Sequence, residues 1–251
     1  MKVKTLLIDV GNSRVKWAVL DKNHLCSGKA FSYKEQQIEP LFDAYWKPLS
    51  GITDVIVSNV GGLEIAEHIE GWCSKQWKAN SHFVRPKSHA YGVTNSYQNP
   101  QQLGVDRWVC LVAAREMGER ATCIIDCGTA VTIDALNGEG KHLGGMIAPG
   151  IQLMKRALLN NTSDISEAGD NPECFLGQCT ADAVQNGAIH SVAGLIERAA
   201  RELNKQYKED FLLVLTGGDA EQIQKQLNCD VRLVADLALR GLVVITRDQS
   251  K

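Results

Sequence analysis

The sequence predicts an α/β protein made of two similar halves, each with a mixed β-sheet. The first observation is a duplication, because residues 6–21 and 123–138 both contain an apolar run, Asp-x-Gly, a small polar residue and a second strand-like run. The second is a constant offset, since Asp9 and Asp126 are 117 residues apart. The third is the alternation of strand-like and helix-like segments in both halves, which is typical of α/β proteins. We therefore expect two domains, residues 1–115 and 116–251.

Length and composition restrict the class of protein. The chain has 251 residues, of which 44% are hydrophobic and 22% charged, with a net charge of −2. A chain of this length can bury a sizeable core. Its pI is near 6.3 and it has no basic run, so it lacks the charge that binding of nucleic-acid phosphates requires. We expect no nucleic-acid partner.

The sequence also predicts a cytoplasmic protein with no membrane partner. Only three consecutive apolar residues, 6–8, precede Asp9, whereas a secretory signal needs about 7–15. No window approaches the roughly 20 apolar residues of a membrane span. The eight cysteines are scattered without a C-x-x-C pair, which is typical of reduced thiols in the cytosol.

In the first half, the apolar run before Asp9 has the length and composition of a buried strand. Gly11 permits a turn at positive φ, so the half opens with a β-hairpin. Residues 85–103 collect Pro, Gly and Asn and form a long loop, which at this length is usually functional when ordered. We expect further strands over 29–32 and 54–58, and helices over 34–46, 63–77 and 104–117.

The second half opens with an equivalent hairpin over residues 123–138. Thr180 precedes a long apolar-periodic segment, so we expect it to be a helix N-cap. Residues 160–178 are polar and irregular. The remaining expected elements are strands over 143–147 and 211–215 and helices over 151–159, 180–203 and 237–246.

The segment from Asp9 to Lys16 has features of a phosphate-binding turn. A turn containing Gly exposes backbone N–H groups, its small side chains let phosphate approach, and Lys16 supplies a cation. Taken alone, the pattern is more typical of a plain β-turn with an Asx bond. Its duplication around Asp126 and Thr129 favours phosphate, because two such turns facing across a cleft can hold one polyphosphate, and their carboxylates can hold cations.

The segment Gly104-Val105-Asp106-Arg107 opens an expected helix. An acidic residue there commonly compensates the helix dipole, and an adjacent Asp-Arg is commonly a surface pair. The functional alternative is that the loop containing Tyr97 leads a substrate to Asp106, which accepts a hydroxyl proton, and to Arg107, which binds an acid group. The turn at 216–219, Thr-Gly-Gly-Asp, fits either a ligand packed on the backbone or a simple connection.

Five motifs in this order and spacing resemble the type III pantothenate kinase family. The resemblance covers nearly the whole chain and implies two ribonuclease-H-like domains of the actin-like superfamily, with ATP in the cleft between them. It implies transfer of the γ-phosphoryl group of ATP to pantothenate, in the first step of coenzyme A biosynthesis. The motifs are D-V-G-N-S-x-x-K at 9–16, Y-Q-N-P-x-x-L-G-V-D-R-W at 97–108, D-C-G-T-A-x-T-x-D at 126–134, G-G-x-I-x-P-G at 144–150 and T-G-G-D at 216–219.

The resemblance also implies roles for individual residues and partners. Asp106 would be the proton acceptor, and Asp126 would bind an activating K⁺ or NH₄⁺, with Mg²⁺ accompanying ATP. The chain would form a homodimer with the substrate site at the interface. The first turn departs mildly from the family, with Asn12-Ser13 where many members have Asn-Thr. ATP would bind Asp9, Val10, Gly11, Asn12, Ser13, Arg14, Val15, Lys16 and Thr129, and pantothenate would bind Tyr97, Gly104, Val105, Asp106, Arg107 and Thr180 of the neighbouring subunit.

Two other functions fit the same residues. One is a phosphotransferase or phosphatase of the same superfamily that acts on a sugar or an acyl phosphate. Tyr97 and the segment 104–108 argue against it, and a substrate panel distinguishes the two. The other is a non-catalytic regulator that binds ATP. The presence of Asp106, Asp126 and Lys16 favours an enzyme.

Overall fold

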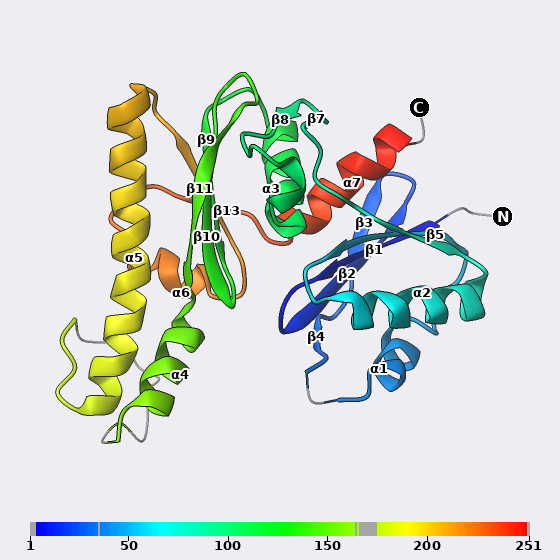
Figure 1. Ribbon diagram of the computed structural model, residues 1–251, viewed down its shortest axis with the longest axis horizontal. Coiled ribbons are helices and arrows are strands. Elements are labelled where there is room, and N and C mark those ends of the chain that lie inside the picture. Colours follow the sequence, from blue (N-terminus) through cyan, green and yellow to red (C-terminus); the bar gives the residue numbers. More distant parts are fainter. Residues whose placement is uncertain (1–3, 35, 164, 166–174, 250–251) are drawn as a thin grey trace. The chain divides into compact units, whose positions relative to one another are not determined.

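The computed structural model describes residues 4–34, 36–163, 165 and 175–249, which fall into two compact units (Figure 1). Unit 1 is Met1–Gly118 together with Asp236–Lys251, and unit 2 is Glu119–Ala235. The last helix, which we expected in the second half, packs in unit 1 instead. Its apolar periodicity predicts a buried face but does not specify the surface that covers it.

The sheet of unit 1 has the strand order β3-β2-β1-β5-β6, with a short strand, β4, also paired to β2. Strands β1 and β2 form an antiparallel hairpin, whereas β5 runs parallel to β1 and β6 parallel to β5. The connection from β2 to β5 therefore passes through β3, β4 and a helix. The strands are β1 (Lys4–Val10), β2 (Arg14–Asp21), β3 (His24–Ser27), β4 (Phe31–Ser32), β5 (Ile52–Asn59) and β6 (Asn80–Phe83).

Helices cover both sides of this sheet (Figure 1). On one side, α1 (Ile38–Tyr45) and α2 (Leu63–Trp77) bury an aromatic cluster in which Phe42 stacks on Trp46 at 4.3 Å between ring centroids. On the other side, α3 (Val105–Glu116) packs on α7 (Leu237–Gln249). That contact is close because a Cβ at Gly241 would lie 1.9 Å from the carbonyl oxygen of Val109.

The sheet of unit 2 repeats the arrangement, with the order β11-β10-β9-β12-β13. The first two strands again form an antiparallel hairpin, and β12 and β13 again continue the sheet in parallel on the other side of β9. The duplication seen in the sequence is thus a duplication of topology. The strands are β9 (Thr122–Cys127), β10 (Ala130–Leu136), β11 (His142–Pro149), β12 (Leu212–Thr216) and β13 (Arg232–Leu233).

One face of the unit 2 sheet packs against helices. Alternate residues of β9, including Ile125, join a buried cluster with Ile189, Val192 and Ile196 of the long helix α5. None of the helices in the described ranges is long and apolar enough to cross a membrane. The helices are α4 (Ile151–Asn161), α5 (Thr180–Tyr207) and α6 (Ala220–Gln224).

Both predicted hairpins and helix 63–77 are confirmed, and the other predicted helices differ from the structure mainly at their ends. The predicted loop over residues 85–103 contains two short strands, β7 (His89–Ala90) and β8 (Val93–Thr94), and a 3₁₀ turn at Pro100–Gln102. Strands β3 and β6 were not predicted. Most of the irregular stretch 160–178 lies outside the described residues.

Two local predictions were wrong. The residue before the first turn of α5 is Cys179, so Thr180 is the first helical residue and not the N-cap. Neither Gly11 nor Gly128 has a positive φ. Each hairpin instead closes with a backbone hydrogen bond, from Gly11 to Arg14 at 3.0 Å and from Gly128 to Ala130 at 3.1 Å.

Candidate active site

The turn between β1 and β2 places a carboxylate and an ammonium opposite each other. Asp9 and Lys16 are directly paired across the two antiparallel strands, so their side chains leave the sheet on the same side. Asp9 shares this side with Leu7, opposite the cluster that α1 and α2 cover, so it lies on the α3 and α7 side of the unit 1 sheet. The side chains of Asp9 and Lys16 and the helix α3 therefore lie on the same side of this sheet.

The glycine at the tip of this turn leaves open space. A Cβ at Gly11 would meet only the carbonyl oxygen of Arg14, at an ordinary 3.5 Å. At Gly128, the equivalent position in unit 2, the nearest atoms are 3.6 Å away. Since neither glycine is required by φ or by crowding within the chain, the space beside each turn can admit a ligand that approaches the backbone.

A second cluster forms where α3 begins. The side chain of Arg107 is buried, and its Nη1 donates a hydrogen bond to the hydroxyl of Tyr97 at 2.8 Å. The guanidinium also lies 5.7 Å from the centre of the Tyr97 ring, within the range of a cation–π contact. Tyr97 is held in turn by Asn95, whose Oδ1 accepts a hydrogen bond from the Tyr97 backbone. Arg107 is therefore not half of a surface Asp-Arg pair.

Asp106 stands in the first turn of the same helix. Its Oδ1 accepts a hydrogen bond from the backbone N–H of Arg107 at 2.8 Å, which fixes the carboxylate at the helix N-terminus. A Cβ at Gly104 would lie 2.5 Å from this oxygen, so the glycine before the helix gives the carboxylate room. An acidic side chain in the first turn of a helix interacts favourably with the helix dipole.

In unit 2, the turn after β9 lies beside the turn after β12. Thr216 pairs with Asp126, and the backbone N–H of Asp219 donates to the carbonyl oxygen of Cys127 at 2.9 Å. A Cβ at Gly217 would lie 2.5 Å from Asp126 Oδ1. The Thr-Gly-Gly-Asp motif is therefore packed against the Asp126 carboxylate.

The β9–β10 turn is also packed against the start of α4. The backbone N–H of Gly150 donates to the carbonyl oxygen of Thr129 at 3.0 Å. A Cβ at Gly150 would lie 2.2 Å from the carbonyl oxygen of Gly128, so only glycine allows this contact. The G-G-x-I-x-P-G motif thus ends where it supports the turn that carries Thr129.

Burial shifts the pKa values of two ionisable groups in this part of unit 2. It raises the pKa of Asp219, and the nearby ammonium of Lys155 opposes that rise. Burial also raises the pKa of the Cys127 thiol to about 12, with Asp126 and Asp219 adding to the effect. Lys155 is only 7% exposed, and it was not predicted as a site residue because its burial depends on packing between distant segments.

The predicted site residues are divided between the two units. Unit 1 carries residues 9–16, Tyr97 and 104–107, and within it Arg107 and Tyr97 are in direct contact. Unit 2 carries Asp126, Thr129 and Thr180. Thr180 is exposed at the start of α5.

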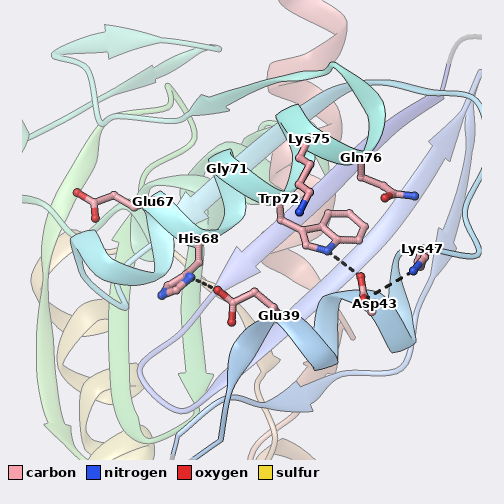
Figure 2. A pocket seen from close by; sticks show the side chains of 9 residues that line it. All are labelled: Glu39, Asp43, Lys47, Glu67, His68, Gly71, Trp72, Lys75 and Gln76. Atoms are coloured by element: carbon pink, nitrogen blue, oxygen red, sulfur yellow. Dashed lines mark hydrogen bonds and ion pairs between the residues drawn. The ribbon is translucent and has the colours of Figure 1, made fainter.

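Two surface pockets of unit 1 contain none of these residues. A groove of about 520 Å³ lies between α1 and α2, and Figure 2 shows the side chains that line it. Its polar groups bind one another, since Trp72 Nε1 donates to Asp43 Oδ1 at 3.0 Å and His68 contacts Glu39. A neighbouring pocket of about 620 Å³ is lined in part by Tyr33 and Gly61.

Comparison with known sequences gives a consistent result. The profile of the type III pantothenate kinase family matches residues 5–202. The type III pantothenate kinase of Nitrosococcus oceani is 38% identical over 252 residues, covering 98% of this chain and 95% of that protein. That of Dechloromonas aromatica is 38% identical over 235 residues, covering 94% of this chain and 95% of that protein.

Solved structures show the same architecture in other proteins. A protein from Campylobacter jejuni, assigned to a Baf family of transcriptional activators, has a TM-score of 0.61 at 25% identity and covers 98% of this chain and 100% of its own. An archaeal actin homologue has a TM-score of 0.51 at 12% identity, covering 98% of this chain and 99% of its own. The fold is therefore actin-like, with ribonuclease-H-like sheets in both units.

Proposed function

Because this chain belongs to the type III pantothenate kinase family, which phosphorylates pantothenate with ATP in coenzyme A biosynthesis, we propose which of its residues perform that reaction. The observation that carries the proposal is the cluster at the start of α3, where Asp106 is fixed at a helix N-terminus and Arg107 is bound to Tyr97. The duplicated turns supply the second part of the site.

ATP binds at the two turns. Residues Asp9, Val10, Gly11, Asn12, Ser13, Arg14, Val15 and Lys16 hold its phosphates from unit 1, and Thr129 contributes from unit 2. The open space beside Gly11 and Gly128 supports this assignment, as does the placement of Lys16 beside Asp9. As a kinase the enzyme uses ATP with a divalent metal, for which we propose Mg²⁺; when bound with the nucleotide it would offset phosphate charge beside Lys16.

Pantothenate binds at the start of α3. Arg107 binds the carboxylate of pantothenate, because a guanidinium presents paired N–H donors that match a carboxylate. Tyr97 holds that guanidinium in place. Gly104 and Val105, at the N-terminus of α3, also contact pantothenate in this proposal. Thr180 of a second subunit completes the site.

Asp106 accepts the proton of the primary hydroxyl of pantothenate. The hydroxyl oxygen attacks the γ-phosphorus, the bond from that phosphorus to the β,γ-bridging oxygen breaks, and ADP leaves. A free aspartate has a pKa near 3.9, so it is ionised at neutral pH but is a weak base. This is sufficient because proton transfer is late in a loose phosphoryl-transfer transition state, in which orientation and charge stabilisation dominate.

Asp126 is the proposed ligand of K⁺ or NH₄⁺. The described residues contain no cluster of three or more His, Cys, Asp or Glu side chains that could hold a metal ion. The carboxylate of Asp126 and the carbonyl oxygen of Cys127 both lie against Gly217, where a Cβ would be 2.5 and 2.4 Å from them. Oxygen donors of this kind suit a hard cation, and such an ion would supply positive charge to the site.

The enzyme is proposed to act as a homodimer in the cytoplasm. Among the described residues, seven of the eight large hydrophobic side chains that are exposed lie in unit 2, and exposed apolar groups that gather in one patch mark protein interfaces. Sedimentation velocity tests the oligomeric state, and cell fractionation tests the location. The exposed large hydrophobic residues of unit 2 are Met146, Ile147, Leu153, Leu158, Phe175, Leu176 and Leu233.

The reaction is tested by product identification. Purified protein is incubated with ATP, MgCl₂ and pantothenate, and 4′-phosphopantothenate is detected by mass spectrometry, with a panel of sugars and acetate as competing acceptors. Pantothenate should be the acceptor that turns over. The similarity to a protein assigned as a transcriptional activator suggests a non-catalytic role as the alternative. Isolation of a stable protein partner, together with an absence of turnover, would favour that alternative.

A further inference from the structure

The turn between β1 and β2 is held by two consecutive residues, Ser32 at the end of β4 and Tyr33 directly after it. The hydroxyl of Tyr33 donates a hydrogen bond to the carbonyl oxygen of Gly11 at 2.8 Å. One residue earlier, Ser32 Oγ donates to the carbonyl oxygen of Ser13 at 3.2 Å. The turn has three carbonyl groups, at residues 11–13. Two of them thus accept hydrogen bonds from side chains that are 22 and 19 positions away in the sequence.

The Tyr33 hydroxyl fits because residue 61 is glycine. A Cβ at Gly61 would lie 2.5 Å from the Tyr33 oxygen and 2.9 Å from Val10 Cγ1. Gly61 does not have a positive φ, so space and not backbone conformation requires glycine here. Its own N–H donates to Asn59 Oδ1 at 2.9 Å, which fixes the residue beside the turn.

The direction of the Gly11 carbonyl controls the direction of a backbone donor. The peptide between Gly11 and Asn12 is planar and trans, so its C=O and the N–H of Asn12 point in opposite directions. While Tyr33 holds the carbonyl on its own side, the Asn12 N–H points to the opposite side. A carbonyl turned the other way would present a negative dipole to a phosphate oxygen in place of a donor.

We propose that Tyr33 is a positioning residue for the nucleotide: through Gly11 it aims the Asn12 N–H at a phosphate, and Gly61 provides the space that this contact needs. The inference rests on the proposed role of residues 11–13 in phosphate binding. Tyr33 acts through the backbone and does not itself touch the nucleotide.

The test is nucleotide binding by calorimetry, together with separate KM values for ATP and pantothenate. Tyr33→Phe should raise the Kd for ATP by about 2- to 10-fold, the range expected for one hydrogen bond. The KM for pantothenate should stay within error, and the thermal midpoint should fall by no more than the few degrees expected for one hydrogen bond. Tyr45→Phe is the matched control, because it removes a hydroxyl in the same unit from a ring that stacks on Phe31.

A double-mutant cycle makes the test sharper. Gly61→Ala should weaken ATP binding more than Tyr33→Phe does, because the new methyl group displaces the tyrosine hydroxyl. The two effects should be less than multiplicative in the double variant, since phenylalanine has no hydroxyl for Ala to displace. Independent effects on ATP binding would contradict the proposed coupling.

Lys16→Ala separates this inference from the proposed ATP site. If Lys16→Ala weakens ATP binding and Tyr33→Phe does not, the positioning role is wrong while the phosphate site stands. If Lys16→Ala leaves ATP binding unchanged, the assignment of the phosphate site is wrong, and the role inferred for Tyr33 is wrong as well. A Tyr33→Phe enzyme that is less stable and weaker for both substrates would show a purely structural role and overturn the inference.

Discussion

Arg107, which is buried, donates a hydrogen bond of 2.8 Å to the half-buried Tyr97 and so ties the long loop of unit 1 to the first turn of α3. The contact joins two residues that were predicted to bind one substrate. It also fixes a guanidinium that neighbours the carboxylate of Asp106 along the helix. The loop over residues 85–103 is therefore part of the proposed acceptor site.

Removal of the Tyr97 hydroxyl should weaken pantothenate binding. Tyr97→Phe keeps the ring beside the guanidinium but loses the hydrogen bond, so the KM for pantothenate should rise about 10-fold, equivalent to ~1.4 kcal/mol. The KM for ATP should change little. Steady-state kinetics with each substrate varied checks this, with Tyr207→Phe in unit 2 as the control. An equal rise in both KM values would argue against a specific role in acceptor binding.

Asp126→Asn should abolish the response to monovalent cations. The neutral amide binds K⁺ less well than a carboxylate, so the ratio of turnover in KCl to turnover in NaCl should fall to about one. Asp210→Asn is the control, since Asp210 is an exposed residue of the same unit that pairs with Arg120 at 2.6 Å. If the variant kept its potassium stimulation, Asp126 would not be the cation ligand.

Gly217→Ala should destabilise the protein by about 2–4 kcal/mol. Gly217 has a φ of 100°, and a Cβ there would lie 2.4 Å from the carbonyl oxygen of Cys127. Gly218→Ala is a matched control, because a Cβ at that position meets nothing within 4 Å. Chemical denaturation of both variants measures the difference. Equal stabilities would mean that the 216–219 turn is not packed as described.

Stability should fall as the pH rises above 9. Burial raises the pKa of Cys73 from 9.0 to about 12, so between these values the unfolded chain loses this proton while the folded chain keeps it. The free energy of unfolding then decreases by about 1.4 kcal/mol per pH unit for each such thiol. Cys73→Ala should make this dependence shallower. The same change at the exposed Cys26 is the control and should leave it unaltered.

Local features of the sequence were sufficient to predict the hairpins and most helices. A buried strand followed by Asp-x-Gly can be recognised from a short stretch of sequence. The apolar periodicity of α2 is likewise a local pattern. The packing of α7 on α3 was not predictable, because periodicity indicates a buried face but not its partner. The order of the strands in each sheet likewise depends on contacts between distant segments.

The candidate site was predictable where its residues are adjacent in the sequence. Asp9, Lys16 and Asp106 lie in short motifs, whereas Tyr33 and Lys155 were missed because their roles depend on packing. Tyr33 reaches Gly11 across 22 positions, and Lys155 approaches Asp219 from α4. The positive φ expected at Gly11 was wrong because the hairpin closes without it.

The central claim is that Asp106 accepts the proton of the pantothenate hydroxyl. The most direct measurement is pantothenate-dependent ADP release by Asp106→Asn, compared with Glu116→Gln at the other end of α3. We predict that Asp106→Asn stays folded and loses turnover by about 10²–10⁴-fold, while Glu116→Gln retains it. A folded Asp106→Asn enzyme with most of its activity would contradict the account.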